Sequence, residues 1–171
     1  MRLFVALSPP AAVIDHADSA VARVRARHPE LRWVPAHRWH LTLAFYGEVA
    51  DDDLDSVRGR ITRAVRGKAA MELSFRGAGF FARRAVWLGI VGDVAGLQAL
   101  AREVATERRP FRPHLTVARM RGTTDPGPAV AELADYEGPP WVADSVHLVR
   151  SQLGPSPTYA DMATWSLDRR S

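Results

Sequence analysis

At 171 residues, with 47% hydrophobic and 25% charged side chains, the chain has the composition of a soluble globular protein and not of a disordered segment. It has no cysteine, which excludes disulfides, thiolate metal sites and cysteine nucleophiles. Its net charge is +4, and Lys68 is the only lysine, so nearly all the cations are arginine. Arginine suits phosphate recognition, but high-GC codon usage produces the same bias, and this net charge alone does not indicate nucleic-acid binding.

The amino terminus contains a short apolar run, residues 3–7, that ends at Ser8-Pro9-Pro10. Such a run is too short for the apolar region of a signal peptide and far too short to span a bilayer. We therefore expect a cytoplasmic protein that does not insert into a membrane.

In the first half of the chain, alternating residues predict a strand at 2–8. Pro9-Pro10 then opens a helix that should run to Arg27 and end at His28-Pro29. A second strand is predicted at 39–46 and is closed by Gly47. The three acidic residues at 51–53 favour the start of a helix that runs to residue 65.

In the second half, strands are predicted at 71–75 and 85–91, on either side of a Gly- and Arg-rich connection at 76–84. Asp93 should cap a helix over 94–108. A strand at 113–120, a loop at 122–128 and a short helix at 129–134 follow. The last predicted elements are strands at 141–150 and 159–167.

The two halves share the order strand, helix, strand: 2–8, 11–27 and 39–46 correspond to 85–91, 94–108 and 113–120. This order predicts a duplicated unit. We expect the α+β class, with residues 1–171 forming a single bilobal domain. Each lobe should be a small, largely antiparallel sheet with helices packed outside it, and a central cleft should separate the lobes.

Each half also carries one copy of a short motif, His40-Leu41-Thr42-Leu43-Ala44 and His114-Leu115-Thr116-Val117-Ala118. Because side chains alternate along a strand, His, Thr and Ala of each copy should share one face. Leu41, Leu43 and Phe45 should take the core face of the first copy, and Leu115 and Val117 that of the second. If the lobes pack with approximate two-fold symmetry, the two His-Thr faces meet across one cleft.

Two histidines that flank one site suit general acid–base catalysis, because one imidazole can be neutral and the other protonated near neutral pH. Threonine hydroxyls two residues away can donate hydrogen bonds to the oxygens of a phosphoryl group. This set of groups predicts metal-free attack of water on a phosphodiester.

Two alternatives remain open on the residues alone. Each motif could be an ordinary half-buried strand. The presence of a second copy at the corresponding place in the other half of the chain argues against this explanation. A metal site could instead use His37, His40 and His114, although the motif strands contain no acidic residue. His147 lies in an apolar strand, where a packed and hydrogen-bonded role is expected.

The two H-x-T-x motifs and their framework resemble the 2H phosphoesterase superfamily, in particular its RNA 2′,3′-cyclic phosphodiesterases, long described as 2′-5′ RNA ligases. The resemblance covers nearly the whole chain. The residues that carry it are 2–7, 32–35, 40–49, 77–81 and 110–119, with Ser151, Gly154 and Tyr159 near the end. The chain departs from the family at Phe81-Ala82-Arg83-Arg84-Ala85, where both prolines of the usual Phe-Pro-Arg-Pro-Arg are missing.

The resemblance implies a bilobal fold, no metal or other cofactor, and hydrolysis of cyclic phosphates to a 2′-phosphate, with 2′-5′ ligation as a possible reverse reaction. It implies that His40 protonates the leaving oxygen and that His114 activates water. The resemblance also implies that Thr42 and Thr116 bind the phosphoryl oxygens of the substrate. It implies that Arg119 supports phosphate binding, although strict alternation along the strand would point Arg119 away from the face that carries the histidine. Tyr159 is a further candidate for substrate binding.

The expected partner is an RNA or oligonucleotide with a 2′,3′-cyclic phosphate end, bound by a monomer. The alternative function is a non-catalytic module that binds RNA or phosphorylated ligands. Candidates for stacking on bases are Trp33, Trp39, Phe80, Phe81 and Arg83, although aromatic residues at strand spacing are more often part of a core.

Overall fold

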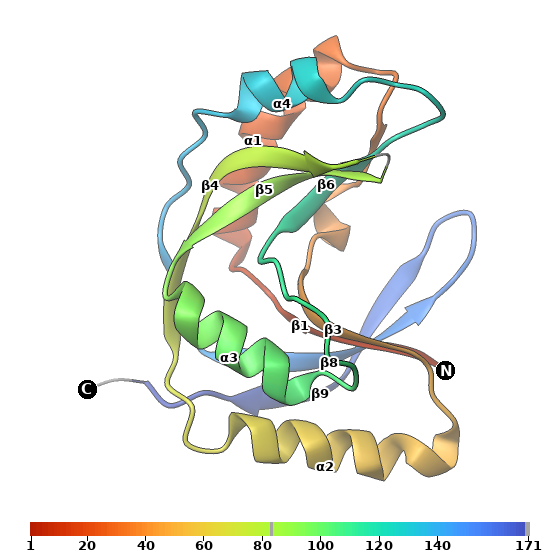
Figure 1. Cartoon of the computed structure of the whole chain (residues 1–171), viewed down its shortest axis with the longest axis vertical. Coiled ribbons are helices and arrows are strands. Elements are labelled where there is room, and N and C mark those ends of the chain that lie inside the picture. The colour runs from red at the N-terminus through yellow and green to blue at the C-terminus, as the bar shows by residue number, and fades with distance from the viewer. Residues whose placement is uncertain (83, 170–171) are drawn as a thin grey trace.

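The computed structural model describes residues 1–82 and 84–169, and they form two antiparallel sheets (Figure 1). Sheet A has the strand order β3 (Leu41–Glu48), β1 (Arg2–Leu7), β8 (Ser145–Gln152), β9 (Thr158–Ser166). Sheet B has the order β2 (Arg32–Trp33), β6 (Leu115–Arg119), β5 (Ala85–Gly92), β4 (Met71–Phe81), β7 (Trp141–Ala143). The predicted α+β class with antiparallel sheets is confirmed.

Helices lie outside both sheets, as predicted. Helices α2 (Leu54–Val65) and α3 (Val94–Val104) contact each other and lie against sheet A. Helices α1 (Ala11–Arg27) and α4 (Gly127–Leu133) contact each other on the side of β4, in the upper part of Figure 1. Two short 3-10 helices, Ala36–Arg38 and Asp51–Asp53, precede β3 and α2.

The duplication predicted from the element order is present. The units β1-α1-β3 and β5-α3-β6 each pair their two strands antiparallel in one sheet. The helices are exchanged between the lobes: α1 belongs to the unit whose strands β1 and β3 pair in sheet A, but it lies with α4 near sheet B (Figure 1). Helix α3 connects two strands of sheet B but contacts β3 of sheet A.

Apolar side chains from both sheets and from all four helices form one continuous core, in which the largest fully buried side chain is that of Phe75. Strand β1 shows how the core is divided from the cleft. Its Leu3, Val5 and Leu7 belong to this core, whereas Phe4 and Ala6 point to the other face of sheet A. Each fully buried aliphatic side chain contributes about 1.5–3 kcal/mol to folding.

The connection predicted at 76–84 is wrong, because most of it extends β4 to Phe81. The glycines that suggested a loop have other roles. Gly77, with φ of +66°, belongs to a bulge at which two residues of β4 oppose one residue of β5. At Gly79 an added Cβ would lie 2.4 Å from the ring of Trp87, so the close approach of this ring requires glycine. Arg83 lies outside the described residues.

The strand predicted at 141–150 is in fact two strands that separate at Asp144 and join different sheets, β7 in sheet B and β8 in sheet A. The helix predicted at 94–108 ends earlier, at Val104. There the Tyr46 hydroxyl donates to the Val104 carbonyl at 2.7 Å and Ala105 turns to extended backbone. The strands predicted to begin at 39 and 113 begin at Leu41 and Leu115, directly after each histidine. Strand β2 was not predicted.

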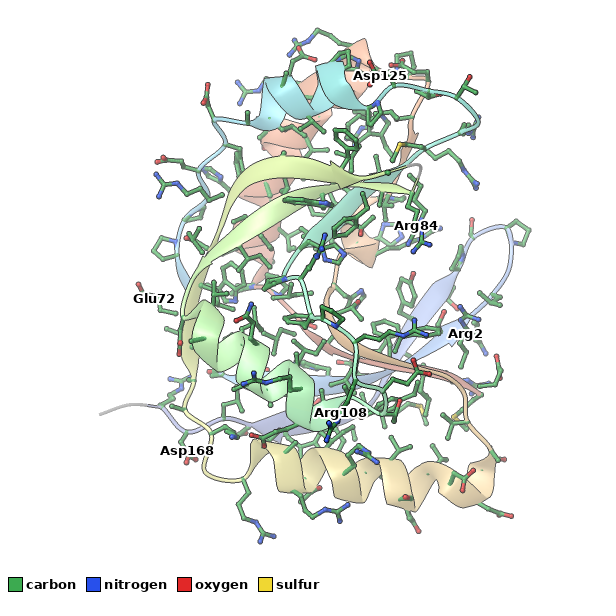
Figure 2. The ribbon with its side chains drawn as sticks, in the orientation of Figure 1. Arg2, Glu72, Arg84, Arg108, Asp125 and Asp168 are labelled. Carbon is green, nitrogen blue, oxygen red and sulfur yellow. The ribbon has the colours of Figure 1, made fainter. Side chains whose placement is uncertain are left out.

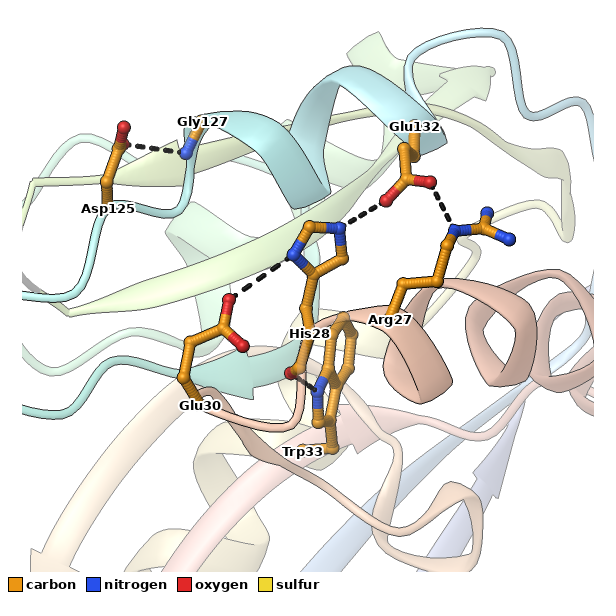
Figure 3. Close-up of polar contacts among 7 residues, drawn as sticks. All are labelled: Arg27, His28, Glu30, Trp33, Asp125, Gly127 and Glu132. Carbon is orange, nitrogen blue, oxygen red and sulfur yellow. Dashed lines mark hydrogen bonds and ion pairs between the residues drawn. The ribbon is translucent and has the colours of Figure 1, made fainter.

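A polar cluster joins the end of α1 to α4 (Figure 3). The Nε2 atom of His28 contacts the Glu132 carboxylate, and its Nδ1 lies 3.3 Å from Glu30. Arg27 also donates to Glu132 at 2.5 Å, and the Trp33 indole donates to the His28 carbonyl at 2.8 Å. The hydrogen bond from His28, followed by that from Arg27, lowers the pKa of Glu132.

We predict that Glu132→Gln lowers the free energy of unfolding at pH 7. A carboxylate whose pKa is lowered by folding stabilises the fold above its ordinary pKa, here 4.5, and this contribution is lost as the pH falls through the lowered value. The gap between wild type and variant, measured by urea unfolding, should therefore narrow below pH 4.5. Glu30→Gln, which touches only the other nitrogen of His28, should have a smaller effect. A gap for Glu132→Gln that is constant with pH would contradict this account.

Candidate active site

The two motifs meet in one cavity of about 510 Å³ between the sheets. His40 and Thr42 reach it from the start of β3, and His114 and Thr116 reach it from the start of β6. Arg119, at the end of β6, lines it as well, as does Arg2, which is labelled in Figure 2. Tyr159, the further candidate, also lines the cavity, so all six residues named from the sequence are brought together although they come from both halves of the chain.

Both imidazoles are held in the same way. The Nδ1 atom of His40 lies 3.0 Å from the carbonyl oxygen of Arg38, and Nδ1 of His114 lies 2.6 Å from that of Arg112. A carbonyl oxygen can only accept, so Nδ1 must carry a proton in both rings. This leaves each Nε2 free to accept or donate a proton toward the cavity.

Aromatic side chains hold the ring planes. The His40 ring meets Tyr159 and Phe4 edge-on, with centroid distances of 5.1 and 5.6 Å. The His114 ring meets Phe81 in a similar geometry, at 4.9 Å and an interplanar angle of 87°. With the carbonyl contact on one side and these edges on the other, each imidazole has little freedom to rotate.

The predicted alternation along the motif strands holds up to Leu43 and Val117, which lie in the core, and is wrong after them because each strand contains a bulge. Val5 pairs with Ala44 and Ala6 pairs with Thr42, so Leu43 is an extra residue in β3. Val117 is likewise extra in β6. A bulge places two successive residues on one side of the strand and shifts the residues that follow. Three expectations fail for this reason: Ala118 lies in the core, Ala44 packs against the core, and Phe45 is 51% exposed.

The same bulges explain why Arg119 reaches the cavity, although strict alternation from His114 would place it on the opposite face of the strand. Arg119 stands three residues after Thr116, and Phe45 stands three residues after Thr42. Both line the cavity, so they occupy equivalent positions in the two halves. The guanidinium of Arg2 lies over the Phe45 ring, 4.6 Å from its centroid, a cation–π geometry.

The surroundings of His40 lower its pKa from the ordinary value. Burial lowers the pKa of His40, while the hydrogen bond to Arg38 and the negative charge of Asp161 act in the opposite direction. Asp161 lies two residues after Tyr159 on β9 and contacts Nδ1 of His147 at 2.9 Å. The predicted role of His147 is confirmed, since Ser145 also contacts its Nε2 at 3.0 Å.

Several other candidates are separated by the structure. His37, the third residue of the alternative metal set, is exposed and does not line the cavity. Among residues 1–82 and 84–169 no group of three or more His, Asp or Glu side chains is arranged to hold a metal ion. Of the aromatic candidates, Trp39 is buried in the core, Trp33 lines the cavity, and Phe81 contacts His114. None of the helices in the described part of the chain is long and apolar enough to cross a membrane.

Sequence reasoning missed three arginines of the cavity wall: Arg2, Arg32 and Arg38. One signal was available, because the repeated motif extends backwards to Arg-x-His-Leu-Thr, with Arg38 and Arg112 two residues before the histidines. These are the residues whose carbonyls hold the imidazoles. Two imidazoles, two hydroxyls and several guanidinium groups around one cavity can bind a phosphoryl group and transfer protons on both sides of it.

Comparison with known proteins gives a consistent result. The family model of the 2′-5′ RNA ligase superfamily matches residues 9–155. An RNA 2′,3′-cyclic phosphodiesterase of Methanothermobacter thermautotrophicus is 28% identical over 183 residues, covering 98% of this chain and 99% of that protein. One from Thermus thermophilus is 32% identical over 187 residues, covering 98% and 90%.

Solved structures agree with these relatives. A crystal structure of a protein from Thermus thermophilus superimposes with a TM-score of 0.79 at 28% identity, over 100% of both chains. Escherichia coli LigT in complex with ATP gives a TM-score of 0.78 at 27% identity, over 98% of both chains. The same protein in complex with 3′-AMP gives 0.76 at 27% identity, over 97% of both chains.

We predict that Asp161→Asn lowers the pKa of His40 further, because it removes a negative charge that favours the imidazolium. The measurement is an NMR titration of the His40 ring protons. Asp55→Asn, on α2 and outside the cavity lining, is the matched control and should leave the titration unchanged. An unchanged or raised pKa in Asp161→Asn would show that the carboxylate does not act on His40.

Proposed function

Because the chain belongs to the 2′-5′ RNA ligase superfamily, we propose that it hydrolyses the 2′,3′-cyclic phosphate end of RNA to a 2′-phosphomonoester by paired histidine acid–base catalysis. The observation that carries the proposal is the convergence of two equivalent His-Thr pairs, with both Nδ1 atoms held by carbonyls, on one cavity. Relatives that cover nearly the whole chain are RNA 2′,3′-cyclic phosphodiesterases, and the E. coli relative binds 3′-AMP.

In the proposed reaction, water attacks the phosphorus atom of the cyclic diester while Nε2 of His114 takes its proton. The bond from phosphorus to the ribose O3′ breaks, and Nε2 of His40 donates a proton to the departing oxygen. Hydroxyl donors from Thr42 and Thr116, with the guanidinium of Arg119, stabilise the charge that develops on the non-bridging oxygens. No metal or other cofactor is needed in this scheme, since protein groups supply both proton transfers.

Burial acts against the acid role of His40 in the free protein, because it lowers the pKa and so favours the neutral ring. A bound phosphoryl anion beside Nε2 has the opposite effect, since a nearby negative charge stabilises the imidazolium. Asp161 contributes in the same direction. We infer that His40 becomes the acid mainly in the substrate complex.

The same two groups would serve ligation. The 5′-hydroxyl of a second RNA would replace water as the nucleophile and lose its proton to His114, while His40 again protonates the ribose O3′. The product is a 2′-5′ linkage. One chain supplies both His-Thr pairs, which supports a monomer as the active form, and we place that activity in the cytoplasm.

We predict that His40→Ala and His114→Ala each lower kcat/KM by about 10²–10⁴-fold, the usual contribution of one general acid or base. The assay uses 2′,3′-cyclic nucleotides and a cyclic-phosphate-ended oligonucleotide in EDTA, with 2′- and 3′-phosphate products separated by chromatography. His37→Ala, exposed and outside the cavity, should retain wild-type activity. Binding without turnover by the wild type would favour the non-catalytic module, and turnover that requires added zinc or manganese would favour a metal hydrolase.

A second prediction separates the two roles. A phosphodiester with a good leaving group, such as p-nitrophenolate, needs no protonation on departure. It should restore the rate of His40→Ala far more than that of His114→Ala, which still lacks the base. Equal restoration in both variants, measured by p-nitrophenolate release, would refute this assignment of acid and base.

A further inference from the structure

A second cavity, of about 1020 Å³, lies next to the proposed active site. One wall is residues 43–47 of β3, and the other is the segment 101–111 at and after the end of α3. Phe45 lines both cavities, so its side chain lies at the boundary between them.

The second cavity is basic. Arg102, Arg108 and Arg109 line it and are all exposed, and Figure 2 shows Arg108 on the segment that follows α3. The acidic side chain in the lining, Glu107, pairs with Arg109 at 2.7 Å. Three guanidinium groups against one carboxylate favour an anionic ligand.

The segment that carries these arginines is anchored where it begins. The Tyr46 hydroxyl donates to the Val104 carbonyl at 2.7 Å, and Arg60 on α2 donates to the Ala105 carbonyl at 3.3 Å. The wall of the second cavity is thus attached to the strand that carries His40 and Thr42.

The junction between the cavities has the features of a surface that binds single-stranded nucleic acid. Phe45 presents an exposed ring, and Arg2 places a guanidinium 4.6 Å from the centroid of that ring. Such surfaces combine aromatic rings, on which bases stack, with cations that follow the phosphates. An acidic peptide would match the charges, but it would have no reason to begin at a phosphate site.

We propose that the RNA strand on the 5′ side of the cyclic phosphate passes over Phe45 into the second cavity, where Arg102, Arg108 and Arg109 contact its phosphates. The inference rests on the proposed function of the first cavity. It adds that the preferred substrate is an oligonucleotide and not a mononucleotide. The volume of about 1020 Å³ is at the upper end of the ~300–1,000 Å³ typical of small-molecule pockets, which leaves room for more than one nucleotide.

The test compares 2′,3′-cyclic AMP with a six-nucleotide RNA that ends in a 2′,3′-cyclic phosphate. Wild type should have the higher kcat/KM on the hexanucleotide. In the triple variant Arg102→Gln, Arg108→Gln, Arg109→Gln, the ratio of kcat/KM for hexanucleotide to that for cyclic AMP should fall at least about tenfold. The slope of log(kcat/KM) against log[salt] for the hexanucleotide should become shallower by about 2, since each phosphate contact on a single strand contributes about 0.7.

The matched control removes three exposed arginines of the α2 region that line neither cavity: Arg58→Gln, Arg63→Gln, Arg66→Gln. It should keep both the ratio and the salt slope of wild type. Each of three results would overturn the inference. They are an equal loss of kcat/KM on both substrates in the triple variant, no preference of wild type for the hexanucleotide, and competition by polyglutamate that is as strong as competition by the oligonucleotide. If wild type turns over neither substrate, the proposed function fails instead. The proposed path of the RNA strand can then still be tested by fluorescence anisotropy of a labelled hexanucleotide with a 3′-phosphate. The triple variant should bind this RNA more weakly than the control variant does.

Discussion

The site depends on one contact made twice, from a backbone carbonyl to the Nδ1 of a histidine two residues later. The contact fixes the tautomer and the ring direction together, and it uses a main-chain group that no substitution at Arg38 or Arg112 removes. It also requires the backbone to turn just before the strand, which is why β3 and β6 both begin one residue after their histidine. The aromatic side chains around the rings maintain the orientation that this hydrogen bond fixes.

The exchange of helices keeps the two contacts in a fixed relation. Helix α3 joins two strands of sheet B yet lies against β3, and α1 lies beside α4 although the strands of its unit, β1 and β3, belong to sheet A. Movement of one sheet relative to the other would therefore disturb the packing of both helices and the single apolar core that they share. A site divided between two sheets gains from such rigidity, because general acid–base catalysis needs both imidazoles at defined positions around one phosphate.

The sequence was sufficient for the repeated unit, the antiparallel α+β class and the meeting of the His-Thr pairs, because these follow from the periodicity of apolar residues and from a motif that occurs twice. It was not sufficient for the bulges at Leu43 and Val117, since an extra residue in a ladder is defined by the partner strand. The alternation of side chains along a regular strand consequently predicted the wrong face for Phe45 and did not explain how Arg119 reaches the cavity. The division at Asp144 was missed because both resulting strands are apolar, and only the sheets that they join distinguish them.

The route of the chain between the sheets bears on how such a molecule can arise and fold. Strands β1 and β3 lie in sheet A with β2 of sheet B between them in sequence, and the chain later crosses from β3 to β4 and back from β7 to β8. Neither lobe is a continuous segment, so no single cut yields an independent half. The contacts within each lobe join distant parts of the chain, which slows folding. A half-length ancestor with one β-α-β unit would have had a helix without its sheet. Two copies of such a unit that exchanged helices would supply each helix with packing partners and would bring both histidines to one cleft.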